Sequence, residues 1–374
     1  MEAVGLLMLT MQQDNRNIPV GWKHILQKMS QYMADCQGDY GETMVFGDDD
    51  AGKILDLEGI GSRESTHRNH YNYVLQMMSL LLPERYVEKL TDATLVRIAS
   101  KEEIESSVEK PCYARRENVC YEDGGVSLLR SQDKRVFIGI DHGDLGFGSI
   151  AAHGHADALS FQMFLEGTPI FADAGTYIYH IDLENRNAFR KTENHNTVTV
   201  NGKNQSEMLG AFLWGKRAKT TLLWHNLSVG STEENDVFYL EAEHDGYAPI
   251  IHKRKFVFNG RELKIYDSLM QVQKEISYEI HFLLGKDVSV CQSEASKSIC
   301  IRLADGSKVQ MQTSFSDETL QMSSMKKEDL PMAELKKGWI SEEYGKKEPT
   351  EQLCLSGKTS QDITVVTTIA WENK

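Results

Sequence analysis

The sequence contains no stretch of 18 or more consecutive apolar residues, so we expect no transmembrane helix. Its first residues lack the basic cluster that opens a secretory signal peptide, and they carry the acidic Glu2 instead. No repeat of fixed period and no low-complexity linker is present. The compartment in which the protein works is left open by these observations.

Cysteine pairs of the Cys-x-x-Cys type are also lacking, although the chain has six cysteines. Six cysteines in 374 residues do not require a disulfide framework, and we expect mostly free thiols. Cys112 and Cys120 could form a bridge across a hairpin.

Basic residues are fewer than acidic ones, and the formal net charge is −14. General affinity for nucleic acid is therefore not expected. A polyanionic substrate is not excluded, but basic residues would have to gather locally where it binds. Hydrophobic residues make up 40% of the chain, which is enough for a large core, and the length suits two domains.

Helical periodicity dominates the first part of the chain, and we predict a helical domain over residues 1–108. Residues 70–90 show apolar spacings of three and four, with Pro83 expected to end that helix, and Asp92 is expected to cap one helix over residues 92–107. A further apolar helix face is predicted within residues 19–36 from Trp22, Ile25, Leu26, Met29, Tyr32 and Met33.

Strand patterns follow, and we predict a large antiparallel β-sandwich over residues 109–374. Short β-rich runs are separated by turn signals at Gly124-Gly125, Asn201-Gly202, Asn259-Gly260 and Asp305-Gly306. Residues 362–371 are predicted to form a last strand. The fold class is therefore multidomain α+β, with a helical part followed by the sandwich.

The stretch "HGHADALSFQMFLEGTPIFADAG", residues 153–175, holds the most informative polar residues. On a strand, His153 and His155 would point to the same face. Asp173 lies 18 residues after His155, and His195 lies 22 residues further, spacings that suit neighbouring strands of one sheet. Imidazole and carboxylate groups are zinc ligands. The alternative on spacing alone is a set of polar residues that cap strand ends and bond to their neighbours.

The surrounding residues resemble the heparinase II/III-like family of polysaccharide lyases. The resemblance is carried by "GHADALSF" at 154–161, "DAGTY" at 173–177, the pair Arg186 and Arg190, and "HNTV" at 195–198. "HDGY" at 244–247 and "GWISEEYG" at 338–345 extend it, and "FGDDDAGKIL" at 46–55 looks like the late part of the family's helical domain. The resemblance thus covers nearly the whole chain.

This resemblance implies an α/α toroid joined to an antiparallel β-sandwich, and cleavage of acidic, uronate-containing polysaccharides such as glycosaminoglycans by β-elimination. It implies that His153 lies at the active-site cleft as base or carboxylate support, and that His155, Asp173 and His195 bind a structural zinc ion. Tyr177, and beside it Tyr179, would line the cleft, with Tyr177 as the candidate catalytic tyrosine. Packing at a strand end is the alternative role for both tyrosines.

Arg186 and Arg190 would meet substrate carboxylate or sulfate groups, as guanidinium groups do through paired hydrogen bonds. Salt-bridged or solvated roles are the alternative for both arginines. In the family such a substrate would be an acidic polysaccharide, and relatives that degrade it are often periplasmic or secreted.

The chain departs from the family in its helical part. A full toroid needs on the order of 300 residues, whereas about 110 residues precede the predicted sandwich here. Three hypotheses follow: a polysaccharide lyase, a non-catalytic zinc-stabilised sandwich that binds polysaccharide or a partner, and a fragment that needs a second chain or a homo-oligomer to complete the toroid.

Two further groups of residues have side chains that suit a function. Asp48, Asp49 and Asp50 would either bind a cation or cap a helix. His67, Asn69, His70, Tyr71 and Tyr73 are chemically suited to catalysis but follow the "GDDD" segment, where the family does not keep its catalytic residues.

Overall fold

The computed structural model describes residues 1–49, 52, 54–55, 67–227, 237–292, 298–316 and 330–372. The chain divides into two compact units. The helical unit comprises Met1–Met44 and Asp50–Arg116, and the sandwich unit comprises Val45–Asp49 and Glu117–Lys374. The division at residues 116 and 117 compares with the boundary at 108 and 109 that the sequence suggests. The short segment Val45–Asp49 belongs to the sandwich unit although the chain on either side of it belongs to the helical unit.

The described part of the helical unit consists of α1 (Glu2–Gln13), α2 (Val20–Asp35), α3 (His67–Leu81), α4 (Ala93–Ile98) and α5 (Lys101–Glu109). Helix α3 packs against α1, α2 and α5 and supplies half of the buried apolar residues in the core of this unit. It ends two residues before Pro83, as predicted, because the residue before a proline avoids helical geometry. No helix in the described ranges is long and apolar enough to span a membrane.

The single helix predicted after Asp92 is in fact two helices. The Asp92 side chain accepts hydrogen bonds from the backbone N–H groups of Thr94 and Leu95 and caps α4. Ser100 and Glu103 then form a reciprocal capping box that begins α5. A capping box satisfies two backbone donors at a helix start, so it favours a new start over continuation.

The apolar face predicted on α2 is only partly buried. Leu26 lies in the core of the helical unit, whereas Trp22, Ile25 and Met29 are exposed. The candidate group at residues 67–73 begins α3, where His70 Nε2 lies 3.6 Å from Glu2 Oε2 and Tyr73 is buried. The side chains of residues 67 and 69 lie outside the described residues.

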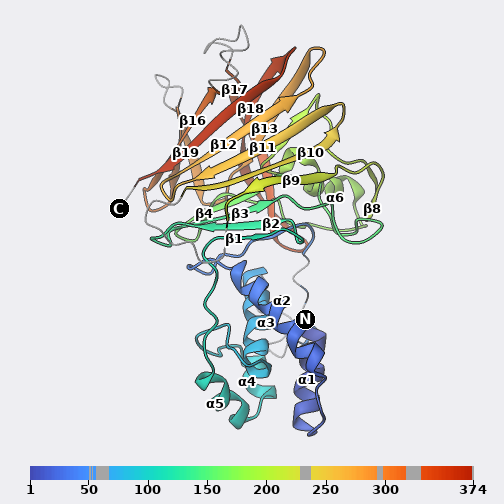
Figure 1. The fold of residues 1–374 in the computed structure, drawn as a ribbon, viewed down its shortest axis with the longest axis vertical. Helices are drawn as coiled ribbons and strands as arrows, with labels where there is room; N and C mark the ends of the chain where they lie inside the picture. The colour runs from blue at the N-terminus through green and yellow to red at the C-terminus, as the bar shows by residue number, and fades with distance from the viewer. Residues whose placement is uncertain are drawn as a thin grey trace. The chain divides into compact units, whose positions relative to one another are not determined.

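The sandwich unit is made of antiparallel sheets (Figure 1). An eight-stranded sheet has the order β14-β15-β16-β19-β12-β11-β10-β9, a five-stranded sheet β1-β2-β3-β4-β5, and a four-stranded sheet β17-β18-β13-β6, with β7-β8 as a small ribbon. In Figure 1 the yellow-to-red strands of the large sheet lie above the green strands of the five-stranded sheet. A backbone bridge between Phe171 and Leu284 joins the five- and four-stranded sheets into one layer.

The first half of the strands has these bounds: β1 Val119–Tyr121, β2 Val126–Arg130, β3 Val136–Asp141, β4 Phe161–Leu165, β5 Thr168–Phe171, β6 Val198–Val200, β7 Met208–Gly210, β8 Leu213–Trp214, β9 Thr220–His225 and β10 Phe238–Tyr247. Between β5 and β6 lie helix α6, Leu183–Arg190, and the short 3₁₀ turn η1, Thr192–Asn194. The second half has these bounds: β11 Ile250–Phe258, β12 Glu262–Met270, β13 Ile276–Leu283, β14 Val288–Gln292, β15 Ser298–Leu303, β16 Lys308–Phe315, β17 Met332–Glu343, β18 Lys346–Thr359 and β19 Ile363–Trp371.

The hairpins that turn signals predict are confirmed. β11 pairs with β12 across Asn259-Gly260, and β15 pairs with β16 across Asp305-Gly306. Both glycines have a positive φ, a backbone conformation that costs glycine nothing. The six cysteines are free thiols, so Cys112 and Cys120 form no bridge.

One apolar core holds the sheets together. Strand β11 alternates buried and partly exposed residues along its length, the pattern of a sheet with one face on a core. At the centre, the Phe161 ring lies 5.5 Å from Phe171, 5.9 Å from Phe256 and 6.2 Å from Phe282. These four rings come from β4, β5, β11 and β13, so they tie both layers together directly beside the polar residues described below.

Two of the buried histidines of this unit, His142 and His281, are held in neutral form. His142 Nε2 lies 3.0 Å from Ser127 Oγ, and His281 Nε2 lies 2.9 Å from Thr199 Oγ1. Burial disfavours the imidazolium and lowers the pKa of each histidine to about 4.

We expect the sandwich unit to lose stability as the pH falls from about 6.5 to 4. Each folded-state pKa lies below the unfolded value of about 6.5, so the unfolded chain takes up the proton first. Above about pH 6.5 each histidine makes its full contribution to the free energy of unfolding. Below that pH the free energy of unfolding falls by at most about 1.4 kcal/mol per pH unit for each histidine. Urea unfolding at several pH values measures the slope. In the His281→Gln variant the free energy of unfolding should depend less steeply on pH than in the wild type. The control variant His24→Gln, at an exposed residue, should keep the wild-type slope. Equal slopes for all three proteins would contradict the account.

Candidate functional site

The segment "HGHAD" is a loop, and the prediction that it forms a strand is wrong. It lies between β3 and β4, and Ala151, His153 and Leu159 all have positive φ values. These left-handed residues break the alternation on which the expectation of a shared face depended. The two histidines therefore separate: the His153 side chain is 56% exposed, and the His155 side chain is fully buried.

Residues 47 and 48 pack directly on this loop. The Asp48 backbone N–H donates to the His153 carbonyl oxygen at 2.9 Å. Gly47 has a φ of +66°, and a Cβ atom there would lie 2.4 Å from the same oxygen. Only glycine can lie this close to the His153 carbonyl oxygen, and this close contact brings Asp48 against the loop.

Asp48 is the buried centre of the polar cluster. Its two carboxylate oxygens accept hydrogen bonds from both terminal nitrogens of Arg186. The same carboxylate lies 3.0 Å from His155 Nε2 and 3.3 Å from His153 Nδ1. Burial alone would raise the pKa of Asp48, but His155 and Arg186 outweigh burial and hold this pKa well below its ordinary value. Asp48 is therefore an ionised partner that orients two histidines, whereas the sequence suggested a cation ligand or a helix cap.

The other "GDDD" aspartates differ from Asp48. The Asp49 backbone N–H donates to Thr176 Oγ1 at 2.9 Å, and residue 50 lies outside the described residues.

His155, Asp173 and His195 are brought together. One potential ligand atom from each residue lies within 4.8 Å of the other two. Asp173 follows β5 and His195 precedes β6, and these strands belong to different sheets, so the expectation of neighbouring strands in one sheet is wrong. The three residues meet because the two sheets adjoin at Phe171 and Leu284.

Two buried imidazole nitrogens in this cluster have no hydrogen-bond partner among the described residues, His155 Nδ1 and His195 Nε2. The opposite nitrogen of each ring lies 3.0 Å from a carboxylate oxygen, on Asp48 for His155 and on Asp173 for His195. Orphaned polar atoms are rare in protein interiors. A metal-binding histidine commonly donates its other N–H to a carboxylate, as His155 does to Asp48. The donor set therefore fits a zinc ion.

Two more carboxyl groups interact with the cluster, the buried Asp157 and the partly buried Asp141. Burial and the neighbouring charge of Asp157 raise the pKa of Asp141, and burial raises that of Asp157. Burial opposes the charged form of Asp173 as well, but His195 outweighs it and lowers the pKa of Asp173, while Asp173 raises that of His195. The site thus gathers carboxyl groups whose charged forms burial disfavours, and a nearby cation would stabilise those charged forms.

Asn196 fixes the backbone beside two of these residues. Its side-chain amide donates to the carbonyl oxygens of Phe161 at 2.7 Å and Ala172 at 2.9 Å. Its amide oxygen accepts from the Leu283 N–H at 2.6 Å. Asn196 is next to His195 and Ala172 is next to Asp173, so one side chain sets the spacing of both segments.

A buried arginine supports the same segments from the large sheet. Arg254 on β11 donates from one terminal nitrogen to the Leu159 oxygen at 2.8 Å and the Asn196 oxygen at 2.6 Å. Its other nitrogens bond to both carboxylate oxygens of Asp267, which also contacts His252 at 2.8 Å. Arg254 therefore joins the loop that carries His155 to the segment that carries His195, a connection that no short motif reveals.

Both arginines proposed from the sequence for substrate contact are buried. Arg186 is 1% exposed and its charge is paired with Asp48. Arg190 donates to Asn187 Oδ1 and the Gly210 oxygen and stacks on Trp214, and burial beside Arg186 lowers its pKa to about 10. In this structure both guanidinium groups serve internal contacts.

An aromatic cluster lies beside the exposed His153. The His153 ring is 6.1 Å from the ring of Tyr179 and 5.5 Å from that of Phe212, and Tyr179 also contacts Tyr344 at 5.0 Å. Tyr177 instead packs on Phe189, with the Lys347 ammonium 4.8 Å from its ring. Phe212 lies in no motif that the sequence displays, whereas Tyr344 lies in "GWISEEYG" at 338–345, a segment that resembles the family but gave Tyr344 no role.

These features define a class: an antiparallel β-sandwich with a buried His-Asp-His cluster beneath an exposed histidine. Residues 115–371 match the family described as heparinase II/III-like, C-terminal, and the chain belongs to that family.

Individual relatives agree with this assignment. The chain is 28% identical over 199 residues to a heparin-sulfate lyase from Bacteroides stercoris, a match that covers 52% of this chain and 25% of that protein. A solved heparinase III, the BT4657 gene product, is similar in fold at 18% identity with a TM-score of 0.67, over 96% of this chain and 48% of that one. Heparan sulfate lyase HepC from Pedobacter heparinus follows at 16% identity and a TM-score of 0.54, over 73% and 39%. The chain thus spans a quarter to half the length of these relatives.

Proposed function

We propose that the chain acts as a lyase on an acidic, uronate-containing polysaccharide, with His153 as the base of β-elimination. The observation that carries the proposal is the pairing of His153 with Asp48. Asp48 lies 3.3 Å from Nδ1, while the ring is more than half exposed. A carboxylate on one imidazole nitrogen orients the ring and favours a basic second nitrogen, the arrangement used in general-base catalysis.

The reaction needs a base, a proton donor and neutralisation of the uronate carboxylate. The base removes the proton at C5, the C4–O bond breaks, a double bond forms between C4 and C5, and the leaving oxygen takes a proton. His153 Nε2 would accept the C5 proton. Of the two tyrosines suggested by the sequence, Tyr177 remains the predicted donor, and Tyr179 is the one whose ring contacts His153.

The family of the chain and the name of its Bacteroides stercoris relative support a glycosaminoglycan as the substrate class. Arg186 and Arg190 are buried and bond internally, so neither is positioned to neutralise the uronate. We therefore propose that neutralisation comes from residues outside this cluster.

We further propose that the helical unit is the end of an α/α toroid. The exposed side chains of Trp22, Ile25 and Met29 on α2 support this, because contiguous apolar surface on a helix usually packs against another element. A second chain, a second copy of this chain or further toroid residues would cover that face and complete the cleft.

We propose that His155, Asp173 and His195 hold a structural zinc ion. The two orphaned imidazole nitrogens and the adjacent carboxylate support this set. Zinc would cross-link the His153 loop to the segments after β5 and before β6, and would stabilise the folded sandwich. His153 would stay free of the metal because Asp48 holds its ring.

The lyase proposal is tested through the conjugated double bond of the product, which absorbs ultraviolet light. Incubation with heparan sulfate, hyaluronan, alginate and bacterial capsular polysaccharides should raise absorbance for at least one substrate. His153→Ala should lower that rate by about 10²–10⁴-fold, as loss of a general base does. Exposed His24→Ala serves as the control and should keep the wild-type rate. Measurable binding without any rise in absorbance would favour a non-catalytic polysaccharide-binding sandwich.

The zinc proposal is tested by elemental analysis of the purified protein. We expect about one zinc per chain, as for a single site formed by His155, Asp173 and His195. His155→Ala should lower both zinc content and thermal stability, whereas His153→Ala should retain the metal. Unchanged metal content in His155→Ala would show that the ligand set is wrong.

A further inference from the structure

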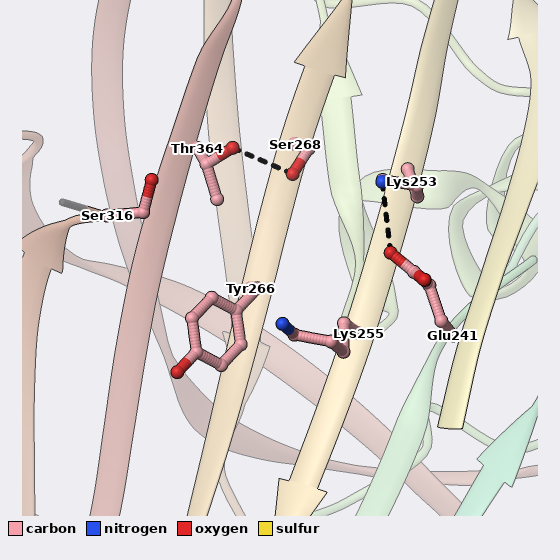
Figure 2. Close-up of a pocket in the computed structure, with 7 residues that line it drawn as sticks. All are labelled: Glu241, Lys253, Lys255, Tyr266, Ser268, Ser316 and Thr364. Atoms are coloured by element: carbon pink, nitrogen blue, oxygen red, sulfur yellow. Dashed lines mark hydrogen bonds and ion pairs between the residues drawn. The ribbon is translucent and has the colours of Figure 1, made fainter. Parts of the chain in front are cut away.

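The outer face of the eight-stranded sheet carries a hollow of about 250 Å³ (Figure 2). It is lined by Glu241, Lys253, Lys255, Tyr266, Ser268, Ser316 and Thr364. These residues come from β10, β11, β12 and β19 and from the end of β16. Figure 2 shows their side chains gathered over neighbouring strands of the same sheet.

This hollow lies on the opposite face of the sheet from the candidate site. Side chains alternate along a strand, so Lys253 and Lys255 point away from the face that Arg254 occupies. Arg254 is fully buried and bonds to the backbone beside His195. A ligand in the hollow would therefore be separated from His153 by the thickness of the sandwich.

Short hydroxyl side chains make the floor of the hollow, and long side chains make its rim. Ser268 is only 6% exposed, and its Oγ lies 2.8 Å from Thr364 Oγ1. Tyr266, two residues before Ser268 on the same strand, stands beside this floor. Hydroxyl groups that both donate and accept hydrogen bonds suit the hydroxyls of a sugar.

The two lysines of the rim differ in how their charges are paired. Lys253 Nζ lies 3.0 Å from Glu241 Oε1. Lys255 is the direct cross-strand neighbour of Glu241, yet its Nζ lies 4.2 Å from the centre of the Tyr266 ring. In the ranges that the structure describes, Lys255 has no carboxylate partner. Its ammonium is therefore available to an anion that enters the hollow.

We propose that this hollow is a second, non-catalytic binding site for one acidic sugar unit of a polysaccharide. Lys255 would pair with its carboxylate or sulfate, and the hydroxyls of the floor would bond to its ring hydroxyls. The volume is below the range of about 300–1,000 Å³ typical of small-molecule sites, which fits a single unit of a longer chain. The ligand class rests on the proposed function. A site remote from the chemistry would hold a polymer on the enzyme between cleavages and raise its local concentration.

The test is protection of individual lysines from acylation, read by mass spectrometry. It uses the His153→Ala chain, in which cleavage is expected to be slowed, with a heparan sulfate tetrasaccharide as the probe and cellotetraose as the neutral control. Saturating tetrasaccharide should slow acylation of Lys255 by at least about fivefold, because the bound acidic group pairs with the ammonium and covers it. Lys264, on the same face of β12 and paired with Glu262, is the matched control and should react at an unchanged rate. Cellotetraose should protect neither lysine.

Protection of Lys255 and Lys264 to the same extent, or of neither, would overturn the proposal, because diffuse attraction to the sheet does not distinguish them. Isothermal titration of Lys255→Gln and Lys264→Gln in the same background gives the second measurement. Only Lys255→Gln should lose affinity for the tetrasaccharide, by about fivefold or more, and equal losses or none would count against the site. Because both readouts measure binding, they stay informative if the chain proves not to be a lyase, and an active lyase with an unprotected Lys255 would refute the hollow alone.

Discussion

The buried carboxylate of Asp48 is the constraint on which the candidate site depends. It pairs with Arg186 and contacts both His153 and His155, although it lies more than 100 residues before them in the chain. A buried charge is costly unless it is paired and hydrogen-bonded. Asp48 and Arg186 compensate each other, so removal of either leaves the other uncompensated within the sandwich unit.

The same carboxylate assigns different roles to two histidines that are nearly adjacent in sequence. His155 is buried with its Nε2 on Asp48, and its free Nδ1 belongs to the cluster with Asp173 and His195. His153 is exposed, since its left-handed backbone turns it away from that cluster. The division between a proposed metal ligand and a proposed base therefore comes from backbone geometry and one shared carboxylate.

Much of the fold follows from local sequence signals. Asn259-Gly260 and Asp305-Gly306 mark their hairpins correctly because a tight turn needs a residue that tolerates positive φ. The grouping of His155, Asp173 and His195 was suggested by a family resemblance, and the structure brings these residues close together. Spacing alone left it open, since the residues come from a loop and from the ends of strands in two different sheets.

Other features depend on tertiary contacts that the sequence does not display. Arginine is seldom fully buried, so substrate contact was the natural expectation for Arg186 and Arg190, and nothing nearby in the sequence identifies Asp48 as a partner. The strand expected at "HGHAD" fails because non-glycine residues there adopt positive φ, held by the contact with Gly47. On α2 the apolar residues do recur at helical spacing, yet Trp22, Ile25 and Met29 are exposed. Periodicity shows that a helix has an apolar face, but it does not show which element covers that face.

The most direct test of this account is the Asp48→Asn variant, compared with Asp123→Asn in the exposed turn after β1. The amide keeps the shape of the side chain but removes the charge that compensates Arg186 and orients both histidines. The account predicts that the free energy of unfolding, measured by urea denaturation at pH 7, falls by about 3–5 kcal/mol for Asp48→Asn and stays near wild type for Asp123→Asn. Equal stability of the two variants would contradict the claim that Asp48 organises the site.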